Sequence, residues 1–310
     1  MCSLLCKVLV GMFILFTPFT FLFFSVYLLV IVFLLTVSNF YFFWVYMEIL
    51  ILLFIGTAYT VFVASYTQLI LYFLMQTLAS FGILVFYILE VQELLVISLF
   101  LKLGMFPFMS WYLNVLFKFP SSILLIRTTV HKLPPLLLFC LFYTSSLCNL
   151  LLVSILLSVF IGGTFIIIVL DFRYLIIVSS IANNGFLLMG LIGGSLHLFW
   201  RFFLLYMVNI TFALYILGGF TKPLLKPVRS RLVIVRTLAL LLINLAAMPP
   251  FPMFLAKFGV LYNFFLVLQF NLFILVILVL FNVLLIASYC QLFIKYIVNS
   301  HSSLSNYLMF

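Results

Sequence analysis

Long apolar runs, separated by short breaks that contain polar residues or proline, fill almost the whole chain. A helix of about 20 apolar residues matches the hydrocarbon thickness of a bilayer. The pattern predicts an all-α fold, a polytopic transmembrane helical bundle of about ten spans with discontinuous helices. The expected spans are 12–36, 40–63, 66–89, 94–117, 121–143, 148–170, 173–192, 197–220, 232–270 and 272–297.

Prolines interrupt three of these spans. Pro107 falls inside the fourth span, and Pro134 with Pro135 breaks the fifth. The ninth region is too long for one straight helix and must break at Pro249 and Pro250; we expect one span with a broken second half, and two spans is the alternative. Inside a membrane such breaks are tolerated only where protein buries them or where they line a cavity.

Composition supports the same class, because 69% of the residues are hydrophobic, only 6% are charged and the mean hydropathy is +1.51. A soluble globule carries about 25% charged residues. We therefore expect a single transmembrane domain over 1–310, with a divergent first helix at 1–40 and a short tail at 299–310. The N-terminus shows neither a signal-peptide cleavage site nor an arginine-rich transit peptide.

The charged loops predict an orientation. In the ten-span arrangement the basic residues of the loops gather on one side, whereas Glu90 and Glu93 fall on the other and Arg201 is an exception. The net charge of +10 therefore reflects topology and contact with lipid phosphates, and no nucleic-acid partner is expected. The basic residues on the common side are Lys7, Lys118, Arg173, Lys222, Lys226, Arg229, Arg231 and Lys295.

No cofactor or metal motif is visible. The five cysteines form no C-x-x-C pair, no two of the three histidines share a predicted helix, and G-x-G-x-x-G and P-loop patterns are missing. The 41 phenylalanines are typical of a T-rich coding strand and favour an organelle genome. We expect no cofactor and no metal in this chain.

Setting the loops aside, we single out four charged residues inside predicted spans: Glu48, Lys102, Lys132 and Lys257. A charge at the centre of a spanning helix costs about 2.5 to 3.5 kcal/mol on insertion scales, so it is usually buried in protein and functional. Desolvation disfavours a charged lysine and a nearby carboxylate favours it, so moving the acid switches the lysine between binding and releasing a proton. The pattern predicts a proton relay, and structural salt bridges are the alternative.

His131 and a polar stretch of the seventh span are weaker candidates. His131 precedes Lys132 and carries a group that exchanges protons near neutral pH, although a packing histidine is equally consistent with this position. The stretch from Ser179 to Gly185 contains two serines and two asparagines, which favour close helix packing and could also hold ordered water.

Five segments resemble the subunit 2 family of the proton-pumping NADH:ubiquinone oxidoreductase, respiratory complex I, in its mitochondrially encoded form. The resemblance runs from about Phe42 to Lys295, and the Lys-Leu-Gly-x-x-Pro-Phe-x-x-Trp element is the most specific part. The segments, in the family's order, are Trp44-Val-Tyr-Met-Glu48, Tyr72-Phe-Leu-Met-Gln-Thr-Leu-Ala-Ser80, Leu101-Lys-Leu-Gly-Met-Phe-Pro-Phe-Met-Ser-Trp111, His131-Lys-Leu-Pro-Pro135 and Pro249-Pro-Phe-Pro-Met-Phe-Leu-Ala-Lys257.

The resemblance implies an antiporter-like subunit of an H⁺-translocating NADH:ubiquinone reductase in the mitochondrial inner membrane. The FMN, iron–sulfur clusters and ubiquinone of that complex are expected in or near other subunits. Its implied partners are other membrane-arm and accessory subunits, membrane lipids and a respiratory supercomplex. Two alternatives stay open: a stand-alone cation/proton antiporter, and a purely structural membrane-arm subunit.

By position, the resemblance also assigns residue roles. Glu48 matches the carboxylate that pairs with the pump lysine, Lys102 matches that lysine, Lys132 the central relay lysine, and Lys257 the lysine on the second broken helix, which leads towards the exit. Asn183 departs from the family, because relatives often have histidine there.

Overall fold

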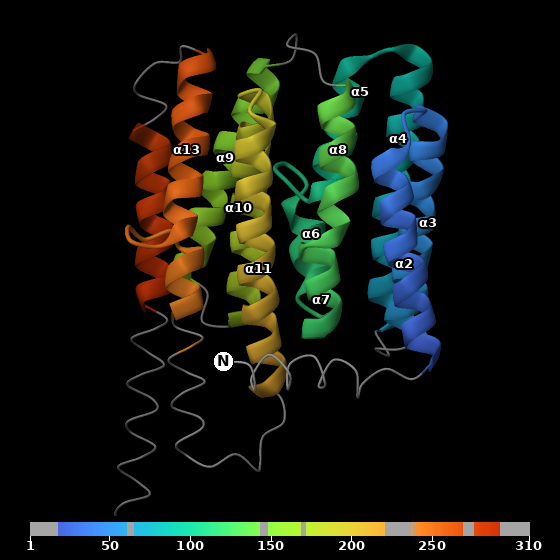
Figure 1. Cartoon of the computed structure of the whole chain (residues 1–310), viewed down its shortest axis with the longest axis horizontal. Coiled ribbons are helices and arrows are strands. Elements are labelled where there is room, and N and C mark those ends of the chain that lie inside the picture. Colours follow the sequence, from blue (N-terminus) through green and yellow to red (C-terminus); the bar gives the residue numbers. More distant parts are fainter. Residues whose placement is uncertain are drawn as a thin grey trace, which may run out of the picture. The chain divides into compact units, whose positions relative to one another are not determined.

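The computed structural model describes residues 18–60, 65–142, 148–168, 172–220, 237, 240–268 and 276–291. Within these ranges the regular structure is entirely helical and no strand occurs, as the ribbon of Figure 1 shows. The predicted all-α class is therefore confirmed. The basic residues Lys7, Lys222, Lys226, Arg229, Arg231 and Lys295 and the tail at 299–310 lie outside the described residues.

Every predicted span contains a helix among its described residues. Five helical segments are long and apolar enough to cross a membrane alone: Phe40–Tyr59, Tyr66–Leu89, Ser121–Phe142, Arg173–Ile192 and Leu196–Ile216. Chain order gives α2 (Pro18–Thr36), α3 (Phe40–Thr60), α4 (Tyr66–Leu89), α5 (Gln92–Leu103), α6 (Met109–Leu116), α7 (Ser121–Thr128), the 3₁₀ turn η1 (Val130–Lys132), α8 (Leu133–Phe142), α9 (Cys148–Ile168), α10 (Phe172–Ile192), α11 (Leu196–Phe220) and α13 (Pro252–Leu268). Residues 240–245 and Val276–Gln291 are also helical.

The chain divides into two compact units, Met1–Ser98 and Leu99–Phe310. In the first unit α3 packs against both α2 and α4. The indole N–H of Trp44 on α3 donates to the backbone carbonyl of Ser80 on α4 at 3.0 Å, which ties these two helices together.

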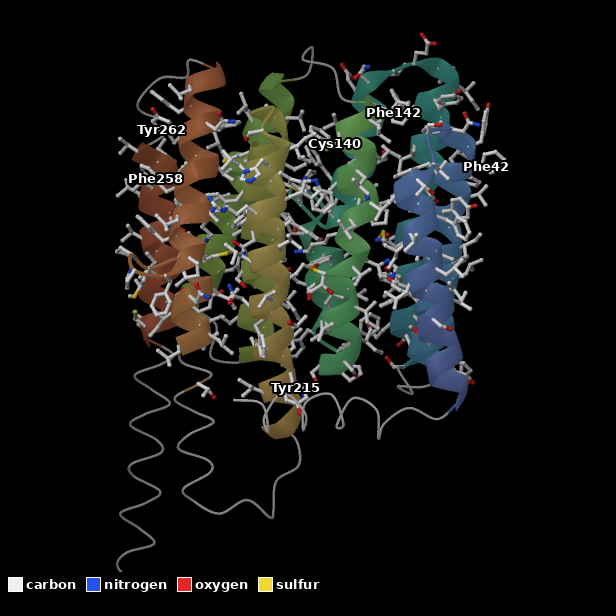
Figure 2. All side chains as sticks on the ribbon, in the orientation of Figure 1. Phe42, Cys140, Phe142, Tyr215, Phe258 and Tyr262 are labelled. Atoms are coloured by element: carbon white, nitrogen blue, oxygen red, sulfur yellow. The ribbon has the colours of Figure 1, made fainter. Side chains whose placement is uncertain are left out.

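The second unit is built around α10, which packs against α6, α7, α9, α11 and α13. The side chains of α10 are almost completely buried over Arg173–Ile192, and Figure 1 shows α9, α11 and α13 running beside it. Outer faces carry large apolar side chains instead: Phe258 and Tyr262 of α13 stack on each other and are each 57% exposed (Figure 2). Because α10 is buried on all sides, it forms the core of the second unit, polar side chains included.

The predicted break at Pro107 is present. Helix α5 ends at Leu103, Gly104 takes a left-handed conformation with φ of 67°, and the N–H of Met105 donates to the carbonyl of Phe100 at 3.0 Å. This six-residue bond around a left-handed residue is the Schellman arrangement that ends many helices. The chain then passes a cis peptide bond before Pro107 and resumes as α6.

The break near Pro249 and Pro250 is also present and has the same form. The short helix over 240–245 ends before Ala247, which is left-handed with φ of 60°, and the N–H of Met248 donates to the carbonyl of Ile243 at 3.4 Å. Helix α13 then begins at Pro252. The ninth region is thus a discontinuous helix over its described residues.

The fifth span breaks one turn earlier than predicted. Helix α7 ends at Thr128, η1 follows, and Pro134 and Pro135 lie in the first turn of α8. Proline is tolerated in a first turn because the N–H groups there have no partner within the helix. The double proline therefore starts a helix, and the break falls at His131 and Lys132.

The described charged residues in loops or near helix ends are mostly exposed. Glu90, Glu93, Lys118 and Arg201 are exposed, and Arg173 is half-buried. Exposure alone does not test on which side of the membrane these charges lie, so the predicted orientation stays a prediction. The organisation of 1–310 as a single domain also stays a prediction.

Candidate functional site

Lys132 is the best-defined member of the predicted site. Its side chain is fully enclosed, with 2% exposure, and its ammonium group donates to the hydroxyl oxygen of Tyr206 at 2.7 Å and to the backbone carbonyl of Ser180 at 3.1 Å. Lys132 Nζ also lies 4.6 Å from the centroid of the Tyr206 ring, within the range of a cation–π contact. The buried ammonium is therefore held by neutral oxygens from α10 and α11.

Further hydroxyl groups lie next to the residues that bind this ammonium. The hydroxyls of Tyr112 on α6 and Ser180 on α10 lie 3.2 Å apart, and Ser180 donates to the carbonyl of Ile177 at 2.7 Å. Tyr206, whose hydroxyl accepts the hydrogen bond from Lys132, is itself fully buried. Hydroxyl groups can both donate and accept, so this set can receive a proton from one neighbour and release one to another.

Lys102 occupies the last turn of α5, directly before the break, and is 3% exposed. Position 104 at the break requires glycine, because a side chain has no room there: a Cβ built at this position would lie 2.4 Å from the ring of Tyr112. The guanidinium of Arg127 donates to the backbone carbonyl of Lys102, and the amide of Asn184 on α10 donates to that of Leu103 at 3.0 Å.

Lys257 occupies the second turn of α13, directly after the second break, and is 2% exposed. Its ammonium donates to the amide oxygen of Asn282 at 3.2 Å and lies 4.9 Å from the centroid of the Phe186 ring on α10. Lys257 and Lys132 thus share one chemistry, a buried ammonium held by a neutral oxygen and an aromatic face.

Helix α10 connects the two lysine sites. It contributes Ser180 to the Lys132 site and Phe186 to the Lys257 site. Six residues of helix separate them, which is about 9 Å along the axis. Between them Asn183 is 2% exposed, and its side-chain oxygen has no hydrogen-bond partner among the described residues. The polar stretch of the seventh span therefore faces the protein interior.

His131 lies in η1 beside Lys132 and is 5% exposed. Because His131 and Lys132 share this three-residue turn, both lie at the break of the fifth span. Its role in proton movement stays a prediction.

Glu48 lies half-buried in α3, in the first unit, whereas the three lysines belong to the second. The pairing of Glu48 with Lys102 therefore stays a prediction as well. Acidic residues that could pair with the lysines are scarce in the sequence, which makes Glu48 important as a candidate partner. The chain has four acidic residues, and Asp171 is the only one between 99 and 310.

Sequence reasoning missed several members of the site. Arg127 is a fourth buried cation of the second unit, 2% exposed, and its position seven residues into the fifth span was a signal that could have found it. Tyr206 and Asn282 had no such signal, because a tyrosine or asparagine in an apolar helix shows no distinctive spacing. Their contacts with the lysines depend on helices far apart in the chain.

No metal centre is suggested by this arrangement. Within the described ranges, no three His, Cys, Asp or Glu side chains gather closely enough to hold a metal ion. The chemistry that the described site can support is proton exchange among ammonium, imidazole and hydroxyl groups.

Discontinuous helices that each carry a buried lysine, packed around one buried helix, define an antiporter-like membrane protein. The family model for the transmembrane part of NADH:quinone oxidoreductases and Mrp antiporters matches residues 73–284, more than half of the chain. The chain belongs to this family, which agrees with the resemblance carried by the motifs.

Individual relatives agree with this assignment. The chain is 31% identical over 172 residues to NADH-ubiquinone oxidoreductase chain 2 of Sylvisorex johnstoni, a match that covers 54% of this chain and 49% of the relative. The chain therefore spans about half the length of that curated relative.

Solved structures show the same fold. A chain of respiratory complex I from Thermus thermophilus with bound aureothin superposes with a TM-score of 0.71 at 18% identity, covering 82% of this chain and 64% of that one. A chain of the Mrp complex from Dietzia sp. DQ12-45-1b gives a TM-score of 0.68 at 15% identity, covering 82% and 56%.

Proposed function

We propose that this chain is a membrane-arm subunit of a proton-pumping NADH:ubiquinone oxidoreductase in the mitochondrial inner membrane. The observation that carries the proposal is the enclosed ammonium of Lys132, held by Ser180 and Tyr206 on a broken span. A permanently buried charge without a carboxylate among its hydrogen-bond partners is costly, so its presence favours a functional role. The family and the match to chain 2 of the oxidoreductase support the same conclusion.

In this proposal the protein moves protons and the redox chemistry takes place in other subunits. FMN, iron–sulfur clusters and ubiquinone belong to those subunits, and the chain acts as part of the enzyme without a redox centre of its own. Its partners are the neighbouring membrane-arm and accessory subunits and the surrounding lipids. Through the whole complex, the chain is also part of a respiratory supercomplex.

The relay runs through the three lysines. A change transmitted from the quinone-reducing end weakens the attraction between Glu48 and Lys102, and Lys102 passes its proton towards Lys132. Lys132 gives its proton to the Tyr206 hydroxyl oxygen, which releases its own proton onward, and His131 assists by accepting or returning a proton. Lys257 then governs release from the second broken helix.

The proposed membership in a complex is tested by separating native membrane complexes by size and locating this polypeptide by mass spectrometry. Migration with a large assembly that oxidises NADH is the expected result, because the proposed function places the chain among the subunits of a membrane arm. Migration alone or as a small oligomer, with ion-driven proton flux after reconstitution in liposomes, would favour the stand-alone antiporter instead.

The proposed relay is tested by Lys102→Ala in the assembled complex. We expect NADH oxidation coupled to proton pumping to be lost while the amount of assembled complex stays near normal. Full coupling in this variant would remove Lys102 from the relay. A loss of assembly that matches the loss of activity would favour the purely structural subunit.

A further inference from the structure

Arg127 is a buried cation of the second unit that the lysine relay does not use. It lies in the last turn of α7 and is 2% exposed. Its guanidinium lies 5.7 Å from the centroid of the Tyr112 ring, and one of its N–H groups donates to the backbone carbonyl of Lys102. Burying a guanidinium is costly unless its donors meet partners of this kind, so the position calls for an explanation.

The partner of Arg127 is the open end of a helix. The last carbonyls of a helix have no partner within it, and inside a membrane no bulk water replaces that partner. At the end of α5, Arg127 binds the carbonyl of Lys102 and Asn184 binds that of Leu103. Side chains from α7 and α10 thus hold two successive carbonyls at the point where the fourth span breaks.

Arginine suits this position for two reasons. The carbonyl end of a helix carries a partial negative charge, which attracts a cation. Arginine also stays protonated in proteins, so its hold on the carbonyl does not change when neighbouring groups exchange protons. A lysine or histidine at this position could lose its charge during the same cycle.

Arg127 also connects the break with the Lys132 site. Its guanidinium faces the ring of Tyr112, which packs against Gly104 at the break, and the Tyr112 hydroxyl lies 3.2 Å from that of Ser180. The backbone carbonyl of Ser180 accepts a hydrogen bond from Lys132. One residue therefore contacts both the backbone of Lys102 and the tyrosine that leads to Lys132.

We infer that Arg127 is a positioning residue, which holds the end of α5 so that Lys102 keeps a fixed place relative to the Lys132 site. The inference rests on the proposed function, in which these lysines pass protons. Arg127 does not itself carry the transported proton. Displacing a proton donor by about 1 Å slows transfer by up to about 100-fold, so a loosened helix end has a measurable effect.

The test compares Arg127→Met with Arg201→Met in the assembled complex. Arg201 is an exposed arginine of α11, so its variant controls for the loss of a positive charge from the same unit. Three quantities are measured: the amount of assembled complex, the rate of NADH oxidation and the number of protons pumped per NADH. We expect Arg127→Met to assemble and to pump fewer protons per NADH, whereas Arg201→Met matches the unmodified protein.

Arg127→Lys provides the conservative variant. An ammonium can still donate to the Lys102 carbonyl but lacks the planar fork that also faces Tyr112, so we expect an intermediate number of protons per NADH. If Arg127→Met does not assemble, Arg127→Lys provides the test. An intermediate number of protons per NADH in fully assembled complex supports the inference, and an unchanged number overturns it.

Lys102→Ala separates the two claims. If Arg127→Met pumps normally and Lys102→Ala does not, the positioning role is wrong and the relay stands. If Lys102→Ala also pumps normally, the proposed relay itself is wrong.

Discussion

Two of the three broken helices of the second unit end in the same backbone geometry but differ in the side chains at the break. Each ends in a Schellman arrangement, around Gly104 in the first and around Ala247 in the second. Arg127 and Asn184 hold the carbonyls of the first helix end. Near the second, the amide of Asn244 donates to the side-chain oxygen of Asn209 on α11 at 2.7 Å. The first helix end is thus held by a buried cation together with a neutral amide, whereas the hydrogen bond beside the second break joins two neutral amide side chains.

The lysines also differ in which end of a helix they occupy. Lys102 lies in the last turn of α5, where the partial negative charge of the carbonyl end attracts a cation, and Lys257 lies in the second turn of α13, beyond the first turn in which the N–H end acts most strongly. The two breaks therefore place a lysine in different electrostatic environments. Such a difference is what a relay needs if one site holds a proton and the other releases it.

Among substitutions at the two breaks, Gly104→Ala is expected to reduce the amount of assembled complex most. A Cβ at this position adds left-handed strain and also meets the ring of Tyr112 at 2.4 Å, so we expect little assembled complex to survive. Gly194 is also left-handed, with φ of 71°, but has open space around it. Gly194→Ala should therefore show the strain alone, about 1 to 2 kcal/mol, and assemble.

The amount of complex on native gels and its thermal unfolding measure this difference. Equal effects of the two substitutions would mean that the contact between Gly104 and Tyr112 does not hold the first break.

Tyr206→Phe should have the next largest effect. The substitution keeps the aromatic face near Lys132 and removes the hydroxyl that accepts its hydrogen bond. A hydrogen bond to a charged group contributes about 1.5 to 3 kcal/mol, so proton transfer is expected to slow by about 10-fold or more. Pumping rates in reconstituted complex give the result, with Tyr262→Phe, on the exposed face of α13, as the control. An unchanged rate would exclude the Tyr206 hydroxyl from the path.

Asn282→Leu makes the matching change at the second lysine and should have a smaller effect. Its bond to Lys257 is longer, at 3.2 Å, and the ring of Phe186 remains as a partner. We expect pumping to slow by about fivefold, consistent with a contribution of about 1 kcal/mol. A larger loss than that of Tyr206→Phe would reverse the order of importance that we assign to the two sites.

Ala247→Gly should have the smallest effect and the opposite sign. A left-handed alanine costs about 1 to 2 kcal/mol, and glycine relieves this strain. The greater freedom of glycine in the unfolded chain offsets part of the gain in stability. We expect a net stabilisation of about 0.5 to 1 kcal/mol, seen as a higher unfolding temperature. Ala246→Gly, one residue earlier, removes a methyl group that is as fully buried as that of Ala247 but relieves no left-handed strain, so it should destabilise instead. Destabilisation by Ala247→Gly would show that the second break does not need the left-handed conformation.

Much of the fold could be predicted from the sequence because membrane helices are long and their apolar character is nearly continuous. The spans at 66–89 and 173–192 match α4 and α10 within one residue. The breaks at Pro107 and at Pro249 were visible because proline cannot continue the hydrogen-bond pattern of a helix. The break in the fifth span was misplaced, since Pro134 and Pro135 start α8 and a 3₁₀ turn precedes them.

The site could be predicted only in part. A lysine in an apolar helix is visible at once, so Lys102, Lys132 and Lys257 were identified, and all three are buried. Their partners Ser180, Tyr206 and Asn282 come from helices that lie 25 to 74 residues away in the chain, and no local pattern marks such contacts. Arg127, seven residues inside the fifth span, could have been found in the same way but was not among the residues singled out.

The most direct test of the account is the number of protons pumped per NADH by assembled complex that carries Lys132→Met. Lys118→Met is the matched control, because Lys118 lies on the surface of the same unit. The account predicts a reduced number of protons for Lys132→Met, with the complex still assembled and still oxidising NADH in the presence of an artificial electron acceptor, and no change for Lys118→Met. An unchanged number of protons in Lys132→Met would contradict the claim that the buried ammonium carries protons.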